Sequence, residues 1–300
     1  TREISGQCIQ SIYKDITQLI GGSADLSPSN NTRIDPILDS NNYDGRYIHY
    51  GVREHAMCAI ANGLSTCGFI PYVGTFLVFI TYCLGAIRMS ALAGHKVLYI
   101  LTHDSIGLGE DGPTHQPVES LTILRSIPNL LTFRPADGKE VVGSYKLALT
   151  QTDKPSALIL SRQKLPQLLS TNSDMVGMGG YTLKNGSDLI LIATGSEVSL
   201  AVDVMNSLES EGMNIGVVSM PCCELFDMQS KSYKNKVLPK NIKKISIEAG
   251  STLGWYKYAD YCIGLDTFGA SGPGPDVMDH FGFTVEKIKT EIKNFFIDSL

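Results

Sequence analysis

The sequence predicts an α/β protein of two domains, each a mainly parallel β-sheet flanked by helices. Three observations lead to this prediction. Segments typical of buried strands alternate with segments of helical periodicity. The length of 300 residues suits two domains. A stretch at 163–186 with Pro166, polar residues and a Gly-rich turn separates two such halves. We therefore expect a first domain over 1–170, a linker over 171–185 and a second domain over 186–300.

The first half begins with a predicted helix over 2–19, which Gly21 and Gly22 would end. Ser, Pro, Asn and Asp residues predict a loop over 27–45, followed by a strand at 47–50 and a helix at 53–66. The segment 68–87 has no charged residue over a length that could span a bilayer. Its Gly, Pro, Thr and Tyr residues instead favour a buried turn that runs into a buried helix.

The rest of the chain continues the alternation. The apolar run 96–101 predicts a strand buried on both faces, and a polar loop follows at 102–117. Further strands are predicted at 130–133, 157–160, 189–193, 214–219 and 244–247, and further helices at 138–150, 195–210 and 284–297. Thr194 and Glu197 have the spacing of a capping box at the start of the helix at 195–210.

Composition excludes several classes of protein. The hydrophobic fraction of 43% is that of a folded protein, and the net charge of −5 without a basic block argues against a nucleic-acid binder. Seven dispersed Cys residues without a C-x-x-C pair predict reduced thiols in a cytosol-like compartment. The neighbouring Cys222 and Cys223 are expected to be buried thiols rather than a redox pair. No signal peptide is visible, and we expect a cytoplasmic protein that does not enter a membrane.

Three stretches that follow predicted strands are candidates for chemistry: 51–54, 102–115 and 161–162. Parallel sheets bind ligands beyond the carboxyl ends of their strands. The loop 102–117 holds two His, two Asp and one Glu among three Gly residues. Polyol recognition with proton transfer suits these side chains, whereas metal binding lacks a close His pair, and a hydrogen-bonded turn is the structural alternative. We predict no metal ligands in this chain.

Other candidates have structural alternatives as well. Glu54, at the start of a predicted helix, either interacts with the helix dipole or exchanges a proton with a ligand. Phe76, Phe79 and Tyr82 recur at a spacing of three residues, which on an apolar helix is typical of core packing. Arg162 could hold a phosphate or a carboxylate, or be a solvated surface residue. The turn at 194–197 is a weak candidate for anion binding.

Taken together, these stretches resemble the second half of transketolase, and the resemblance covers essentially the whole chain. It rests on the motifs GGSADLSPSN (21–30), YIHYGVREHAM (47–57), GTFLVFITYCLGAIRMSAL (74–92), THDSIGLGEDGPTHQP (102–117), FRPADG (133–138), LSRQKLPQL (160–168), ATGSEVSLA (193–201) and FGASGPGP (268–275). The resemblance implies a pyrimidine-binding domain and the small C-terminal domain of a thiamine diphosphate enzyme.

The resemblance also implies roles toward the cofactor. Glu54 matches the glutamate that hydrogen-bonds N1′ of the aminopyrimidine and so promotes loss of the proton from thiazolium C2. Phe76, Phe79 and Tyr82 match the aromatic pocket around the pyrimidine, and Asp25 matches an acidic residue near the cationic thiazolium. A desolvated carboxylate that shares a proton is consistent with the first of these roles.

For the substrate, Asp111 matches the group that recognises a sugar hydroxyl, and His115 a histidine placed for proton transfer. A phosphate grip is implied for Arg2, Ser29, His103 and Arg162, a set that suits a dianion. The implied reaction transfers a two-carbon ketol unit from a ketose phosphate to an aldose phosphate, as in the pentose phosphate pathway.

The family's first half is absent, and no Gly-Asp-Gly motif occurs. That half would bind the diphosphate and its Mg²⁺ or Ca²⁺, so we expect the isolated chain to be inactive without a diphosphate-binding domain or full-length subunit. The start at Thr1 favours a fragment over one subunit of a split pair, and the family implies a homodimer. The alternatives are deoxyxylulose phosphate synthase, the beta subunit of pyruvate dehydrogenase, or a non-catalytic interaction chain.

Overall fold

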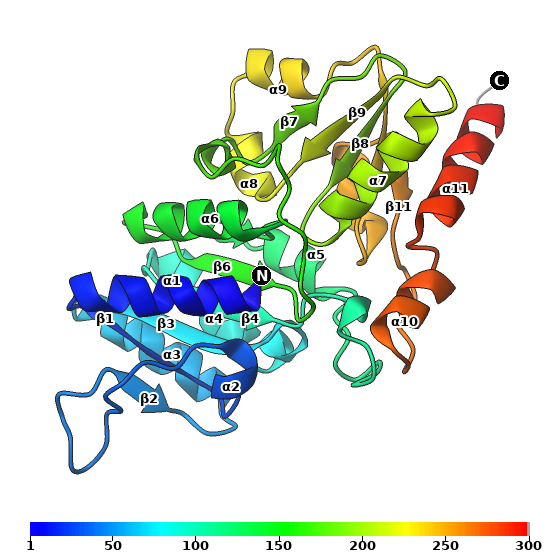
Figure 1. Ribbon diagram of the computed structural model, residues 1–300. Coiled ribbons are helices and arrows are strands. Elements are labelled where there is room, and N and C mark those ends of the chain that lie inside the picture. The colour runs from blue at the N-terminus through cyan, green and yellow to red at the C-terminus, as the bar shows by residue number, and fades with distance from the viewer. Residues whose placement is uncertain (299–300) are drawn as a thin grey trace.

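The computed structural model describes residues 1–298 and contains two α/β domains (Figure 1). The first domain has a six-stranded sheet in the order β2-β1-β3-β4-β6-β5, in which every pair of neighbours is parallel. The second has a five-stranded sheet in the order β11-β10-β8-β9-β7. Only β7 runs antiparallel to its neighbour, β9, among the described strands. The predicted fold class is therefore confirmed.

Helices cover both faces of the first sheet. Residues of α1 and α6, among them Ile9 and Tyr145, form one core, and residues of α3, α4 and α5, among them Met57 and Ile87, form the other. The strands are β1 (Leu19–Ser23), β2 (Tyr47–His49), β3 (Ile70–Phe76), β4 (Leu98–Thr102), β5 (Leu131–Phe133) and β6 (Ser156–Leu160). The helices are α1 (Arg2–Asp15), α2 (Ser27–Asn30), α3 (Glu54–Thr66), α4 (Leu84–Ala93), α5 (Ser120–Arg125) and α6 (Gly138–Thr150), with 3₁₀ turns η1 (Leu77–Tyr82) and η2 (Ile106–Leu108).

The second sheet is also packed on both faces. Residues of α7, α10 and α11 form one core with the strands, and residues of α8, α9 and η4 form the other. The strands are β7 (Tyr181–Lys184), β8 (Leu189–Ala193), β9 (Ile215–Ser219), β10 (Lys243–Ile247) and β11 (Tyr261–Ile263). The helices are α7 (Glu197–Glu209), α8 (Cys223–Asp227), α9 (Lys231–Val237), α10 (Gly274–His280) and α11 (Val285–Asp298), with η3 (Asp174–Met178) and η4 (Thr252–Lys257).

The predicted first helix is too long, because a strand follows it. The helix α1 ends at Asp15, and residues 19–23, which include the glycine pair, form the buried strand β1. A Cβ atom on Gly22 would lie 1.8 Å from the carbonyl oxygen of Ile48, and one on Gly21 would lie 2.1 Å from that of Tyr72. These glycines therefore allow close approach of neighbouring strands rather than ending a helix.

The uncharged segment 68–87 also differs from its prediction. Its first part is the buried strand β3, which pairs with β1 and β4, and η1 and α4 follow. A strand buried on both faces lacks the alternation of polar and apolar residues by which a sequence indicates a strand. Within residues 1–298, no helix is both long and apolar enough to cross a bilayer.

Two further predictions bear on the second domain. Ser196, not Thr194, precedes α7, and the Glu197 carboxylate forms a buried ion pair with Arg134 instead of a capping box. The expected linker at 171–185 contains η3 and β7, and β7 belongs to the second sheet. The position of the domain boundary stays a prediction. Cys222 and Cys223 are buried thiols, as expected.

Candidate functional site

The carboxyl ends of the central strands of the first sheet meet at one edge. Ser23 pairs with Gly74, and Thr102 pairs with Phe76 on one side and Leu160 on the other. The predicted site residues Asp25, Glu54, His103 and Arg162 follow β1, β2, β4 and β6, and Phe76 ends β3. The topology therefore brings residues far apart in the sequence to the edge where parallel sheets bind ligands.

Glu54 is the first residue of α3 and is only 8% exposed. Its side chain accepts no hydrogen bond from any residue in the described part of the chain. Neither carboxylate oxygen is both fully buried and without a partner, so both keep contact with solvent, and the dipole of α3 favours a negative charge at this position. A carboxylate without a donor among the described residues can accept a hydrogen bond from a ligand, such as a ring N–H of a heterocycle.

An aromatic cluster lies beside this edge. Phe76 is buried at the end of β3, and Phe79 stacks on it with ring centroids 5.7 Å apart. Tyr82 lies 6.0 Å beyond Phe79 and is 66% exposed. The three residues come from a strand and a 3₁₀ turn rather than from one apolar helix, so a purely core role does not describe them.

The two histidines of the loop at 102–117 join this cluster. The His103 ring lies 3.7 Å from the Phe76 ring, and the His115 ring lies 5.4 Å from the Phe79 ring in an edge-to-face arrangement. Nδ1 of this half-buried His115 ring is 2.9 Å from the Thr114 hydroxyl, and its Nε2 forms no hydrogen bond with the described residues.

Positive charge gathers next to His103. Nη1 of Arg2 donates to the Ser29 carbonyl at 2.7 Å, and Nη1 of Arg162 donates to the Leu108 carbonyl. Neither guanidinium forms an ion pair with a residue of the described range. Burial, Arg2, Arg162 and His115 together lower the pKa of His103 to about 3. A dianion is the natural complement of two unpaired guanidinium groups.

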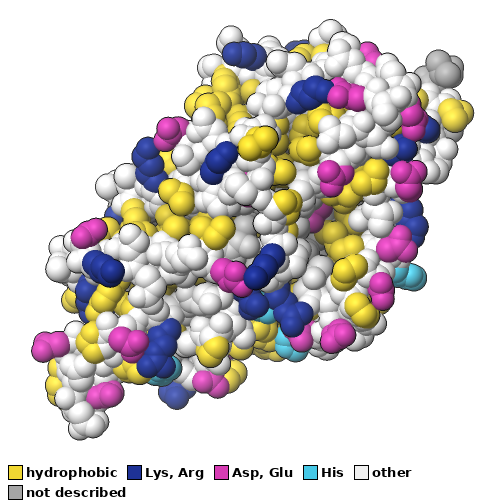
Figure 2. All heavy atoms as spheres, viewed as in Figure 1, with side chains coloured by type: hydrophobic (Ala, Val, Ile, Leu, Met, Phe, Trp, Pro, Cys, Tyr) yellow, Lys and Arg dark blue, Asp and Glu magenta, His cyan; other side chains and the backbone are white. Residues whose placement is uncertain are grey.

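This basic region is accessible. Arg2 and Arg162 line one pocket of about 200 Å³. Figure 2 shows Lys, Arg and His side chains gathered on the visible face near the N-terminal end of the chain. Burial and the neighbouring Arg162 both lower the pKa of Arg2, which is the effect expected when cations face each other without an anion between them.

Two of the three predicted acidic site residues, Asp25 and Asp111, are exposed. Asp25 follows β1 with a φ of 60°, and Asp111 lies in the loop at 102–117. Neither makes a hydrogen bond or an ion pair with the residues the structure describes, so both carboxylates are free for a ligand. In the same part of the chain, no group of three or more His, Cys, Asp or Glu residues could hold a metal ion.

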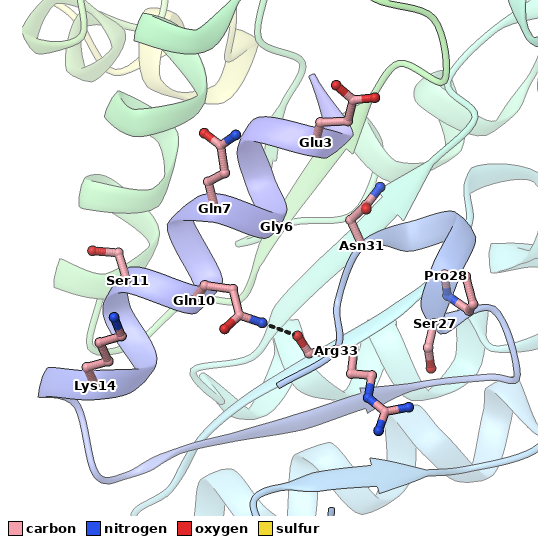
Figure 3. A pocket seen from close by; sticks show the side chains of 10 residues that line it. All are labelled: Glu3, Gly6, Gln7, Gln10, Ser11, Lys14, Ser27, Pro28, Asn31 and Arg33. Carbon is pink, nitrogen blue, oxygen red and sulfur yellow. Dashed lines mark hydrogen bonds between the residues drawn. The ribbon is translucent and has the colours of Figure 1, made fainter. Parts of the chain in front are cut away.

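A second hollow lies away from these residues. Figure 3 shows a groove of about 600 Å³ between α1 and the segment 27–33, where Gln10 donates to the Arg33 carbonyl. None of the predicted site residues lines it. Most of its lining residues are exposed, whereas Ser27 is buried and its hydroxyl accepts a hydrogen bond from Tyr47.

Sequence reasoning missed Thr102 and Asn30. Both are buried, and the Thr102 hydroxyl lies between His103 and Asn30. The signal available was the position of Thr102 as the last residue of a buried strand, directly before a candidate histidine.

The fold is that of a thiamine diphosphate enzyme's pyrimidine-binding domain joined to a second α/β domain. The description "Transketolase, pyrimidine binding domain" matches residues 1–167, and "Transketolase-like TK C-terminal domain" matches residues 179–284. The chain therefore belongs to the transketolase family, as its motifs predicted.

The sequences of known transketolases match nearly the whole chain. It is 49% identical to transketolase 1 of Saccharomyces cerevisiae over 96% of this chain and 44% of that protein, and 48% identical to the chloroplastic transketolase of Zea mays over 98% and 46%. The solved transketolase of Leishmania mexicana superposes with a TM-score of 0.94 at 46% identity, over 97% of this chain and 44% of that one. The chain thus spans about half the length of the relatives it matches.

One solved structure matches this chain over nearly the full length of both proteins. A structure described as a split gene transketolase, inactive beta4 tetramer, superposes with a TM-score of 0.81 over 98% of this chain and 97% of that one. At 23% identity, this likeness shows the shared fold.

Proposed function

We propose that this chain supplies the pyrimidine-binding and sugar-binding half of a transketolase active site. The reaction would transfer a two-carbon ketol unit from a ketose phosphate to an aldose phosphate with thiamine diphosphate. The observation that carries the proposal is Glu54, a buried carboxylate without a protein donor at the sheet edge where the aromatic and imidazole rings gather.

Five side chains would serve the cofactor. Thiamine diphosphate, when bound, supplies the nucleophilic carbon that attack on a ketose carbonyl requires. Glu54 would hold a proton at N1′ of the pyrimidine, because its carboxylate has no donor among the described residues and can accept one from a ring nitrogen. Phe76, Phe79 and Tyr82 pack against the flat ring, and the exposed Asp25 faces the positive thiazolium.

The sugar would be held from both ends. Arg2, Ser29, His103 and Arg162 bind the phosphate, where two guanidinium groups already lie without an anion. Asp111 accepts a hydrogen bond from a sugar hydroxyl. His115 transfers a proton at the substrate oxygen, since its Nε2 is free and its ring is fixed against Phe79.

The other half of the site would come from a diphosphate-binding domain, which would also hold Mg²⁺ or Ca²⁺. It could belong to the same polypeptide or to a separate chain. Exposed Ile60 on α3 and exposed Met89 and Leu92 on α4 give the first domain an apolar surface that suits such a partner, and α3 and α4 pack against each other. A homodimer of the complete enzyme agrees with this surface.

An activity assay tests the proposal. The chain alone and the chain joined to or mixed with its diphosphate-binding half are supplied with thiamine diphosphate, Mg²⁺, a ketose phosphate and an aldose phosphate. We expect transfer only when both halves are present. Turnover of pyruvate in place of the ketose phosphate would contradict the proposal, and so would calorimetry that shows no cofactor binding by the complete pair.

A further inference from the structure

The second domain contacts the loop that carries the proposed substrate residues. This substrate loop, residues 103–116, contains His103, Asp111 and His115. The Ser271 hydroxyl donates to the Glu110 carbonyl at 3.0 Å. From the other side, Nε2 of Gln116 donates to the Ala270 carbonyl at 2.9 Å. The same nitrogen lies 3.3 Å from the Ile106 carbonyl and 3.2 Å from that of Gly109, and Gln116 is only 2% exposed.

Glycines make this contact close enough to fix the backbone. A Cβ atom on Gly269 would lie 1.9 Å from Oε1 of Gln116, and one on Gly274 would lie 2.7 Å from the carbonyl oxygen of Gly107. Gly109 has a φ of +91°, and a Cβ there would lie 3.0 Å from the nitrogen of Gly274. Segment 269–274, which we call the clamp, therefore meets the loop without room for a side chain at two positions: Gly274 against the backbone of Gly107, and Gly269 against the side chain of Gln116.

Arg134 of the first domain links the beginning of the loop to Thr194 and Glu197 of the second domain. The buried Arg134 guanidinium donates to Asp104 at 2.9 and 3.1 Å, to the Thr194 hydroxyl at 2.9 Å and to Glu197. Asp104 follows His103, whose φ of 62° is unusual for a residue with a side chain. Such a conformation persists only where surrounding contacts impose it.

We propose that the second domain is a positioning element for the sugar: the clamp and Gln116 hold the substrate loop so that Asp111 and His115 reach it in one fixed geometry. The inference rests on the proposed function for the identity of the ligand. The physical reason is preorganisation, because a loop ordered before binding does not lose further conformational freedom when the sugar arrives. Glu54 lies on α3 outside the loop, so the clamp should affect the sugar more than the cofactor.

Substitution of Gly269 tests the clamp, with Gly254 as its matched control. Both glycines lie in the second domain, and neither has a positive φ, but a Cβ on Gly254 would meet nothing within 4 Å. In the complete enzyme, we expect Gly269→Ala to raise KM for the ketose phosphate on the order of tenfold or more, since small misplacements are costly. The dissociation constant for thiamine diphosphate should change little, and Gly254→Ala should behave as wild type. Unchanged KM for Gly269→Ala would overturn the proposal.

A double variant separates the clamp from general damage to the fold. Gln116→Ala removes the atoms that the new methyl group would strike. Gln116→Ala alone should raise KM, and adding Gly269→Ala to it should raise KM little further, because the two changes break one contact. If the two substitutions instead raised KM independently, so that their factors multiplied in the double variant, the clamp would be contradicted. If Gly269→Ala does not fold, Ser271→Ala removes a single bond to the loop and should raise KM by a smaller factor; no rise would count against the proposal.

Hydrogen exchange distinguishes failure of the clamp from failure of the proposed function. Amide exchange across residues 106–116 can be followed in this chain without turnover. It should be faster in Gly269→Ala than in wild type and unchanged in Gly254→Ala. A wild-type enzyme without transfer activity would refute the proposed function while leaving this result intact, whereas equal exchange in all three proteins would refute the clamp.

Discussion

The Thr102 hydroxyl lies 2.8 Å from Nδ1 of His103 and donates its proton to Oδ1 of Asn30 at 2.7 Å. Because a hydroxyl has one proton, Thr102 can only accept at His103, so a neutral His103 carries its proton on Nδ1. The amide of Asn30 donates in turn to the Ser23 hydroxyl, which donates to the Gly74 carbonyl. This chain of bonds leaves the lone pair of His103 on Nε2.

The tautomer of His103 is the first prediction. Nitrogen chemical shifts of the imidazole should show a proton on Nδ1 at neutral pH, and His103→Gln assigns the signals by their loss. Thr102→Val removes the acceptor and should move population toward the Nε2–H form. A wild-type ring protonated mainly on Nε2 would show that Thr102 does not set the tautomer.

The lowered pKa of His103 predicts a loss of stability in acid. Its pKa is about 3 in the folded chain, against an ordinary value of 6.5, so the unfolded state binds the proton more readily between these values. The free energy of unfolding should therefore be insensitive to His103 above pH 6.5. It should fall as pH decreases below 6.5, by no more than about 1.4 kcal/mol per pH unit from this group.

Denaturant unfolding of wild type and His103→Gln between pH 7 and pH 4 measures this effect. As pH falls, the free energy of unfolding of the wild type should decrease relative to that of His103→Gln. A constant difference across this range would mean that His103 titrates alike in the folded and unfolded states.

Phosphate binding at this histidine has a related requirement. A neutral ring with its lone pair on Nε2 accepts a hydrogen bond and does not donate one, whereas a phosphate dianion needs donors. Binding of the dianion should therefore favour the protonated ring, because it offsets the repulsion from Arg2 and Arg162 that now disfavours it.

The sequence predicted that several candidate residues follow the carboxyl ends of strands in one sheet, where parallel strands bring them to the same edge. It predicted less of the fold around this edge. Gly21 and Gly22 suggest the end of a helix unless the neighbouring strands are known to approach so closely. Glu197 has the spacing of a capping box with Thr194, but Arg134, more than 60 residues earlier, takes its carboxylate. Contacts between distant segments decide both cases, and local patterns do not report them.

Glu54→Gln tests the proton acceptor. The change keeps the size of the side chain and removes its charge, so transfer by the complete enzyme should fall by roughly 10²–10⁴-fold. The isolated chain should lose no stability, since the carboxylate has no protein donor to lose. Glu286→Gln, at an exposed position on α11, is the control for both measurements. Full transfer activity in Glu54→Gln at limiting cofactor would show that this carboxylate does not serve the cofactor.

Two glycine substitutions should have opposite effects on stability. Gly22→Ala would force β1 and β2 apart, because the added methyl group would overlap the Ile48 carbonyl. Gly63→Ala places a methyl group in open space on α3, where alanine favours the helix by about 1 kcal/mol. Thermal unfolding of the isolated chain should show a lower midpoint for Gly22→Ala and a higher one for Gly63→Ala. Equal midpoints would mean that the close approach of β1 and β2 does not require glycine.

The ion pairs between the two domains lead to the last prediction. Arg134 is fully buried and faces Asp104 of its own domain together with Glu197 and Glu248 of the second. Arg134→Met keeps much of the side-chain volume but leaves Asp104 and Glu197 without their cation, while Glu248 keeps its pair with Arg125. The free energy of unfolding should fall by about 3–5 kcal/mol, the usual result of breaking a buried pair from one side.

The control for Arg134→Met is Arg33→Met, since the exposed pair of Arg33 with Asp35 should contribute less than about 1 kcal/mol.

The remaining charges also predict how the stability of Arg134→Met depends on pH. Burial acts to raise the pKa of Glu248, but Arg125 and Arg134 outweigh it and lower that pKa to about 2. The charged Glu248 carboxylate therefore stabilises the folded wild type above pH 4.5, and this stabilisation is lost as pH falls from 4.5 toward 2. In the variant, where Arg125 alone faces Glu248, this stabilisation should already be smaller at neutral pH. Denaturant unfolding at pH 7 and pH 4 measures both effects, and a loss at pH 7 no larger than that of Arg33→Met would show that Arg134 does not hold the two domains together.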